Sequence, residues 1–395
     1  MQFSARGAAS YFGSLARPIS VRFNSFASAL FVVLGVVTTL LGPLLPLLSL
    51  RWSVSSAQAG TLFFWQFASS TAATLLSGLL LSKRSFRVPS VAGTVLCLAG
   101  VLALTSADWT WGRYAVACYG CGLGIALPAI NLAVAEANPL RRAGSVSLLN
   151  FAWGIGAICG PVLLRVTRSV DLFLFMLAAF LAIGVFVSGF VSMPDKANIK
   201  RIEESTLPAV NLWILVPLFA SAMFALCGIE NAVGGWAASL ALPQFSNAFT
   251  ATDATVAFWT FFLAARALAP IVLRRMSEAK FLFASIIVAI AGVVAFFLAN
   301  SALTVILACA LAGLGIGPGF PLLIARVSEA IGPERPQCTI CFAFAGLGAA
   351  TLPPLVGLLG AKLSQPRAGL LLPVAALILM LPLARKLSEL PRVLQ

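Results

Sequence analysis

The chain contains no histidine, and only 12 of its 395 residues are Asp or Glu. Histidine and carboxylate side chains supply most of the general acids, general bases and metal ligands of proteins. No group of such residues with the spacing of a catalytic or metal-binding site occurs along the sequence. The sequence therefore predicts that the protein is not an enzyme and holds no metal or cofactor. Any proton relay in it must use carboxylates.

The eight cysteines do not replace this missing chemistry. They lie in or beside apolar segments, so they indicate neither a disulfide framework nor a zinc site. Cys338 and Cys341 have the spacing of a redox pair, but small residues that pack between helices are the favoured interpretation.

Charge is scarce as well: charged residues make up 10% of the chain and hydrophobic residues 60%, and the mean hydropathy is +1.01. A soluble domain is nearer half apolar and a quarter charged, so this composition excludes a water-soluble protein. A helix that crosses the hydrocarbon core needs about 20 apolar residues, and the chain holds about twelve such stretches. The predicted spans are 26–50, 57–82, 88–106, 113–137, 143–168, 171–193, 209–242, 253–274, 280–299, 302–328, 338–364 and 367–387.

The net charge of +14 is distributed unevenly along these spans. Of the 26 Lys and Arg, 19 fall in the N-terminal tail, in alternate loops and in the C-terminal tail. Positive residues are enriched in cytoplasmic loops, so we expect both termini to be cytoplasmic. The basic residues thus set the orientation in the membrane and do not indicate a nucleic-acid partner. Those that fall toward the other face are Arg51, Arg113, Arg165, Arg168, Lys362 and Arg367.

The N-terminal segment of about 25 residues is polar and basic and lacks the pattern of a cleavable signal. No Asn-X-Ser/Thr sequon occurs in the chain, which favours a bacterial inner membrane. We expect a monomeric, multi-pass integral membrane protein surrounded by lipid.

The sequence repeats itself over half its length. Residues 28–35 (SALFVVLG) match residues 221–228 (SAMFALCG), and Phe64-Trp65 matches Phe258-Trp259. The strings GLGI at 122–125 and 313–316, and GIG at 154–156 and GLG at 346–348, recur at a similar offset of about 193 residues. A repeat in the same direction within an apolar chain predicts two parallel membrane halves with a solute site between them.

The polar segment 194–208 separates the sixth and seventh spans at the boundary of this repeat. We therefore predict an N-terminal six-helix bundle over 1–193, a cytoplasmic linker over 194–208 and a C-terminal six-helix bundle over 209–395. This organisation resembles the major facilitator superfamily, whose all-α fold has twelve transmembrane helices in two parallel six-helix repeats. The loop after the second span, Gly78 to Arg87, keeps the glycine and the basic charge of that family's loop motif but lacks its aspartate.

Glu230 is the acidic residue that falls well within a predicted span, whereas nearly all other acids sit at span ends. Ionisable residues inside a membrane are costly and usually functional, so Glu230 is the candidate for proton coupling. Arg266, midway along the eighth span, needs an anionic partner. That partner is either Glu230 or a carboxylate or phosphate of the solute, and a static Glu230–Arg266 ion pair is the structural alternative.

The string from Gly228 to Trp236 resembles the seventh span of the fucose–galactose–glucose:proton symporter family. The segments 122–131 and 148–156 are similar to its fourth and fifth spans. This resemblance implies sugar transport. Leu127 occupies the position at which some members carry a glutamate for proton handling, and the first span has Val36-Val37-Thr38-Thr39 in place of an acid. Proton coupling would then depend on Glu230, and otherwise the protein is a uniporter.

A sugar site needs amides for hydroxyl groups and aromatic faces for the apolar side of the ring, within largely apolar walls. Each candidate also has a packing alternative: tryptophans can pack the two bundles or anchor the chain at the membrane interface, and amides can bond neighbouring helices. The residues predicted to bind solute are Gln66, Asn131, Asn150, Trp153, Asn231, Trp236, Trp259 and Arg266.

We therefore expect a secondary transporter that moves a small polar solute, a hexose-like sugar, by alternating access, with protons coupled through Glu230. Three other functions are compatible with the sequence. The Gly156–Pro161 string partly matches a motif of proton-coupled efflux carriers, Arg266 suits an organic-anion carrier, and a membrane sensor or scaffold can use a carrier fold.

Overall fold

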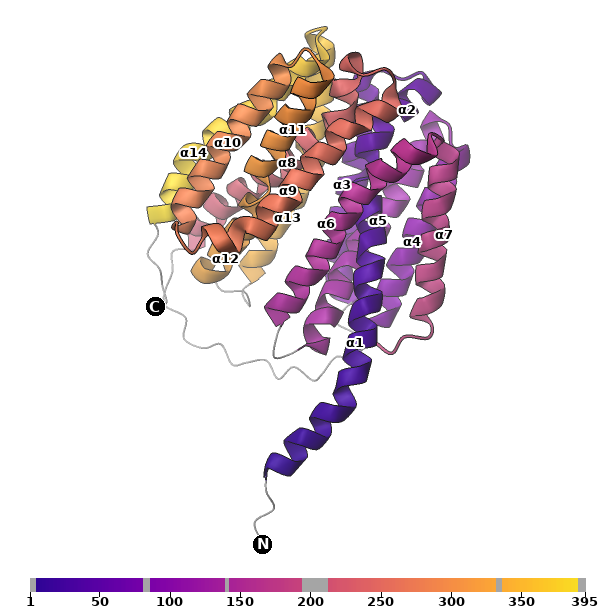
Figure 1. The fold of residues 1–395 in the computed structure, drawn as a ribbon, viewed down its shortest axis with the longest axis vertical. Coiled ribbons are helices and arrows are strands. Elements are labelled where there is room, and N and C mark those ends of the chain that lie inside the picture. Colours follow the sequence, from indigo (N-terminus) through magenta and orange to yellow (C-terminus); the bar gives the residue numbers. More distant parts are fainter. Residues whose placement is uncertain (1–4, 81–85, 139–141, 194–211, 332–335, 390–395) are drawn as a thin grey trace.

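The structure is a computed structural model that describes residues 5–80, 86–138, 142–193, 212–331 and 336–389, as shown in Figure 1. The predicted linker 194–208 lies outside the described residues. Within the described residues the chain forms α-helices and two short 3-10 helices, with no strand. A helix satisfies its own backbone hydrogen bonds, which is what the hydrocarbon core of a membrane requires of a spanning segment.

We call α1 to α7 the first half of the molecule and α8 to α14 the second half. The helices of the first half are α1 (Ala5–Thr38), α2 (Leu41–Trp52), α3 (Ser56–Leu80), α4 (Arg87–Ser106), α5 (Trp109–Ala137), α6 (Arg142–Thr167) and α7 (Val170–Ser188). Those of the second half are α8 (Leu212–Ala241), η1 (Leu242–Gln244), α9 (Ala248–Val272), α10 (Glu278–Leu298), α11 (Ala302–Ile316), α12 (Gly319–Ile331), α13 (Pro336–Lys362), η2 (Pro366–Leu370) and α14 (Leu371–Glu389).

Each predicted span coincides with a helix or with two consecutive helices. The first span consists of α1 and α2, and the tenth consists of α11 and α12. Among the described residues, 11 helical segments are long and apolar enough to cross a membrane. The prediction of an all-helical, membrane-spanning chain is thus confirmed at the level of its elements.

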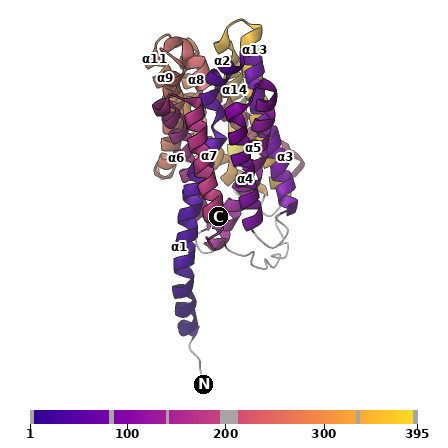
Figure 2. The same ribbon diagram turned by 90° about the vertical axis from the view of Figure 1, so that its right-hand side faces the viewer.

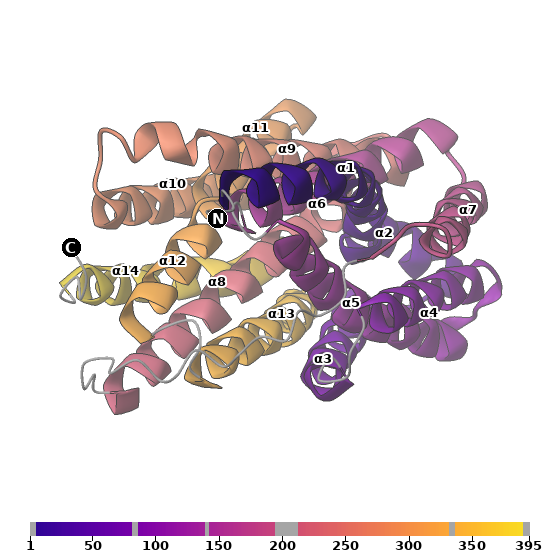
Figure 3. The same ribbon diagram turned by 90° about the horizontal axis from the view of Figure 1, so that it is seen from below.

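The two halves lie side by side with their helices roughly along the long axis (Figure 1). α1 extends beyond the bundle at the end that holds both termini, which we call the terminal face (Figures 1 and 2). The other end is called the opposite face. The view from below in Figure 3 shows the halves meeting along two seams, where α6 packs on α9 and α3 packs on α13.

Repeated glycines make equivalent contacts in the two halves. A Cβ on Gly156 of α6 would lie 1.9 Å from the Val32 carbonyl oxygen of α1, and a Cβ on Gly348 of α13 would lie 1.9 Å from the Phe224 carbonyl oxygen of α8. Only glycine permits backbones to approach so closely. The sequence repeat therefore corresponds to a repeated helix crossing.

The first span is interrupted between α1 and α2, and Pro43 lies in the first turn of α2. Pro43 has no N–H to donate to the Thr39 carbonyl, and the Gly42 N–H donates to that carbonyl at 3.1 Å instead. The Thr38 carbonyl thereby loses its helical donor, and the side-chain amide of Gln66 on α3 donates to it at 2.7 Å. A neighbouring helix thus satisfies the backbone group that the interruption leaves without a partner.

Candidate solute cavity

A cavity of about 610 Å³ lies between the two halves on the side of the terminal face. Its walls come from α6 of the first half and from α9, the start of α10 and α12 of the second half. This volume falls within the range of about 300–1,000 Å³ that is usual for small-molecule sites. The lining residues are Gly144, Ser147, Leu148, Asn150, Phe151, Leu263, Arg266, Ala267, Ala269, Pro270, Leu273, Glu278, Pro318, Pro321, Leu322 and Ala325.

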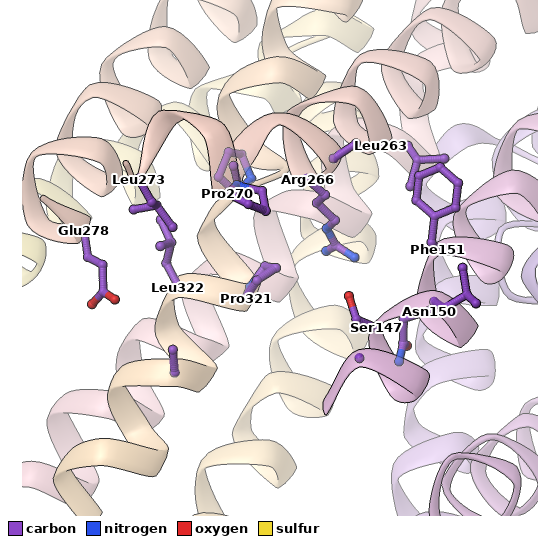
Figure 4. A pocket seen from close by; sticks show the side chains of 16 residues that line it. Ser147, Asn150, Phe151, Leu263, Arg266, Pro270, Leu273, Glu278, Pro321 and Leu322 are labelled. Carbon is purple, nitrogen blue, oxygen red and sulfur yellow. The ribbon is translucent and has the colours of Figure 1, made fainter. Parts of the chain in front are cut away.

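Figure 4 shows how the polar groups of this cavity are arranged. Ser147 and Asn150 come from α6, and the guanidinium of Arg266 extends from α9 toward the space between them and Pro321 of α12. Glu278 lies apart from this group (Figure 4). The cavity is thus mainly apolar, with polar groups converging from both halves.

Arg266 is held by a carbonyl that proline has left free. In a continuous helix the Gly317 carbonyl would accept from the N–H of residue 321, but residue 321 is proline. Arg266 Nε donates to the Gly317 carbonyl oxygen at 3.0 Å, and its guanidinium carbon lies 4.2 Å from the centre of the Phe262 ring. The guanidinium therefore connects α9 to the break between α11 and α12 while it faces the cavity.

Glu230 on α8 is the anionic partner of Arg266. The Glu230 Oε2 to Arg266 Nη2 distance is 3.6 Å, and the side chains are 12% and 20% exposed. Glu230 is not among the residues that line the cavity, so Arg266 stands between the carboxylate and the solute space. Because its charge is matched by Glu230, Arg266 does not need an anionic solute as a counter-ion.

Asn150 and Asn131 form an amide pair between α6 and α5. Asn150 Nδ2 donates to Asn131 Oδ1 at 3.1 Å and to the Val146 carbonyl oxygen at 2.8 Å. The Asn150 amide nitrogen is therefore engaged within the protein, and its carbonyl oxygen is the atom that can accept a hydrogen bond from a solute. Of the two residues, Asn150 lines the cavity directly.

Trp153 and Trp259 meet across the α6/α9 seam, on the opposite-face side of Asn150 and Arg266 along their helices. Their ring centroids are 5.8 Å apart in an edge-to-face arrangement. Trp153 Nε1 donates to the Thr38 hydroxyl at 3.2 Å, which fixes the orientation of its ring. The two rings close the seam between the cavity and the opposite face.

Of the eight predicted solute ligands, Asn150 and Arg266 line this cavity. Asn131, Trp153 and Trp259 do not line it and adjoin it through the contacts described above, whereas three more, Gln66, Trp236 and Asn231, are engaged elsewhere. Gln66 is 1% exposed, and its Oε1 accepts from the Tyr119 hydroxyl at 2.9 Å while its amide nitrogen serves the break in the first span. Trp236 is 2% exposed and donates to the Pro353 carbonyl at 2.8 Å. Asn231 donates to the Cys227 carbonyl of its own helix. In this conformation all three make contacts within the protein.

Ser147 and Pro321 are wall residues that were not predicted from the sequence. Ser147 lies three residues before Asn150 on the same helix, so helical spacing was the available signal. Pro321 interrupts the tenth span, and its place in the cavity depends on how α12 packs against α8 and α10.

A family model described as the Major Facilitator Superfamily matches residues 27–337 of this sequence, which is most of the chain. The chain belongs to this superfamily. It is therefore a multi-pass membrane transporter rather than an enzyme, and the predicted family and twelve-helix fold are confirmed.

The chain is similar to the glucose/mannose transporter GlcP of Bacillus subtilis (strain 168). The two are 24% identical over 352 residues, which cover 84% of this chain and 86% of the relative. The fold is similar to that of a variant of the E. coli fucose:proton symporter FucP, with a TM-score of 0.61 and 15% identity over 94% of this chain and 100% of that chain. A D-xylose-proton symporter gives a TM-score of 0.73 and 15% identity over 95% of this chain and 98% of the other.

Proposed function

We propose that this superfamily member carries a hexose-like sugar across the membrane by alternating access of one cavity to the two sides. The observation that carries the proposal is the cavity itself. It lies between the halves, opens toward the terminal face, and is closed from the opposite face along the α6/α9 seam by Trp153 and Trp259. Its apolar wall with a few polar groups suits a sugar, and the similarity to a glucose/mannose transporter supports this choice.

In this proposal the terminal face is cytoplasmic, because Arg87, Arg142, Arg274, Arg275 and Lys280 lie at or beside helix ends on that face. The structure would then be an inward-open state in a bacterial inner membrane. A FucP structure with a TM-score of 0.62 is described as being in the outward conformation, so this fold also occurs in the alternative state.

The solute ligands that we assign are those that meet at the cavity. Asn150, positioned by Asn131, accepts from a sugar hydroxyl, and Arg266 donates to a sugar oxygen. Trp153 and Trp259 do not line the cavity, and we assign them to closing the α6/α9 seam at its inner end. We assign Gln66, Asn231 and Trp236 to helix packing, since their polar atoms are engaged within the protein.

Glu230 is the residue that we assign to proton coupling. A proton on Glu230 neutralises the carboxylate and removes its attraction for Arg266. Arg266 also holds the Gly317 carbonyl at the break before α12, and α12 forms a cavity wall. Protonation is thereby connected to the solute site through a single side chain.

The test is uptake into proteoliposomes across a panel of neutral sugars, with and without a pH gradient, for the wild type and Glu230→Gln. We expect gradient-driven sugar uptake by the wild type and its loss in the variant. Equal, gradient-independent movement in both would make the protein a uniporter and Glu230 a structural residue. The absence of sugar movement would contradict the proposal.

A second candidate is an organic-anion carrier, favoured by the presence of a guanidinium in the cavity wall. The same panel should include sugar acids and small carboxylates. An anion carrier would prefer the acids, and Arg266→Gln would reduce that preference. A neutral-sugar carrier would retain the same ranking of solutes in this variant.

A further inference from the structure

Arg165 on α6 and Asp253 on α9 form an ion pair between the two halves. Arg165 Nε donates to Asp253 Oδ1 at 3.2 Å. Arg165 lies in the last turn of α6 and Asp253 in the second turn of α9, so the pair sits where this seam reaches the opposite face. From the terminal face inward, the cavity, the Trp153–Trp259 contact and this ion pair follow one another along the same two helices.

We propose that the Arg165–Asp253 ion pair stabilises the state that is open at the terminal face, and that it separates each time the protein opens to the opposite face. For the cavity to open there, the ends of α6 and α9 must move apart, which breaks any contact between these two side chains. Both are partly solvated, with 33% and 38% of their side chains exposed. Water can therefore replace the lost contact, so the pair can separate and form again at modest cost.

The pseudo-symmetry of the fold allows the two seams to be compared position by position. Gly154 of α6 faces Leu263 of α9 across one seam, and the repeat-equivalent Gly346 of α13 faces Thr71 of α3 across the other. The same relation places Gly357 and Thr61 at the positions equivalent to Arg165 and Asp253.

The α3/α13 seam is closed at this level by apolar packing. A Cβ on Gly357 would lie 2.7 Å from the Trp236 ring, and Trp236 also packs against Phe63 with ring centroids 6.2 Å apart. One seam thus has a buried tryptophan where the other has a solvated ion pair. Of the two, the α6/α9 seam is the one whose contact water can replace when the halves separate.

A second ion pair at the opposite face provides a matched control. Arg51 of α2 pairs with Asp171 of α7 at 2.7 Å, with side chains 34% and 48% exposed. Both residues belong to the first half, so they move together when the halves separate. Loss of the Arg51–Asp171 pair should leave the balance between the two open states unchanged.

The experiment measures the distance between the halves at the opposite face by double electron–electron resonance. Spin labels are placed at Thr110→Cys and Lys362→Cys, exposed positions of the first and second half, in full-length protein whose native cysteines are replaced. The proposal rests on the alternation of the halves but not on the solute. Because this measurement requires no solute, failure of the ion-pair proposal is distinguishable from failure of the sugar assignment.

We expect Arg165→Ala and Asp253→Asn to increase the ratio of the long-distance to the short-distance population by about two- to fivefold. The exchanged pair Arg165→Asp/Asp253→Arg should return toward the wild-type ratio. Arg51→Ala should leave the ratio unchanged. Raising the ionic strength should increase this ratio in the wild type, as Asp253→Asn does. In the Asp253→Asn variant itself, the same rise in ionic strength should change the ratio less.

Unchanged distances in both Arg165→Ala and Asp253→Asn would overturn the proposal, as would an equal shift in Arg51→Ala. Failure of the exchanged pair to restore the ratio would show that the effect is not that of an ion pair. If a substitution prevents folding, the salt titration of the wild type still decides: no shift between low and high ionic strength would contradict the proposal.

Discussion

Two polar side chains within the spans bind backbone carbonyls that proline has left without a helical donor. Gln66 donates to Thr38 at the interruption of the first span, and Arg266 donates to Gly317 at the interruption of the tenth. The two side chains differ in what else they face. Gln66 is enclosed within the first half, whereas Arg266 also faces the solute cavity. Two side chains that make the same kind of backbone contact therefore have different roles.

Substitution of Asn150 and of Gln66 should separate solute binding from folding. Asn150→Leu removes a solute acceptor and should raise the KM for uptake by about tenfold with little loss of stability. Gln66→Leu leaves the Thr38 carbonyl and the Tyr119 hydroxyl unpaired and should lower the free energy of unfolding by about 2 kcal/mol with an unchanged KM. Uptake kinetics and thermal unfolding in detergent provide the two measurements. The reverse pattern would place Gln66 in the solute path.

The Arg266–Glu230 ion pair should be more important for stability than the ion pairs at the opposite face. Arg266→Gln leaves a buried carboxylate without its cation and should lower the free energy of unfolding by about 3 kcal/mol. The double variant with Glu230→Gln should recover part of this loss, because the uncompensated charge is gone. Thermal unfolding of the single and double variants gives the coupling energy. Arg51→Gln is the exposed control and should cost at most about 1 kcal/mol; an equal loss there would contradict this account.

At the scale of helices, glycine determines which pairs cross closely. α1 and α6 in the first half, and α8 and α13 in the second, approach at the repeated glycines Gly156 and Gly348. Helix association in a membrane depends on close packing, since lipid tails are as apolar as the side chains that they replace. These crossings position α6 and α13, the helices through which the halves make their two seams.

Gly156→Ala and Gly348→Ala should each lower the free energy of unfolding by about 1–3 kcal/mol. In both cases the added methyl group would overlap a backbone carbonyl, which cannot move away without displacing a helix. Gly144→Ala in α6 is the control, because a Cβ there meets nothing within 4 Å. It should be neutral or slightly stabilising through its helix propensity. Equal effects at all three positions would show that the crossings are not tightly packed.

At the scale of the whole molecule, the cavity exists because the halves meet at one face and diverge at the other. Contacts along α6 and α9 continue from Gly154 and Leu263 through the two tryptophans to Arg165 and Asp253. Toward the terminal face the same two helices line the open space. Which compartment this open state faces depends on which face is cytoplasmic.

The proposed orientation predicts which exposed positions a membrane-impermeant thiol reagent reaches in intact bacterial cells. Lys280→Cys, at the terminal face, should be labelled only after the cells are opened, because that face is cytoplasmic in our proposal. Thr110→Cys, at the opposite face, should be labelled directly. A cysteine-free background provides the control for both. Labelling of Lys280→Cys in intact cells would reverse the orientation.

The order and extent of the spans could be predicted from the sequence because each span has to be apolar over its whole length, whatever its neighbours are. The internal repeat was readable for a related reason: the glycines that recur in it make the same crossing in each half. The candidate site was less predictable. An asparagine or tryptophan within a span is compatible with a solute site and with helix packing. Helical spacing alone does not show that Asn150 faces the cavity whereas Gln66 is enclosed between helices.

What the sequence determined by itself is the series of membrane-spanning helices, the internal repeat, the superfamily and the presence of Glu230 and Arg266 within the second half. These follow from composition and local pattern, which act along single helices. Only the tertiary structure decided that Arg266 pairs with Glu230 while facing the cavity, that Trp236 is enclosed, and that Arg165 meets Asp253. Each of these depends on the rotation and separation of packed helices. Packing within the second half sets them for Arg266 and Glu230, and packing between the halves sets them for Arg165 and Asp253.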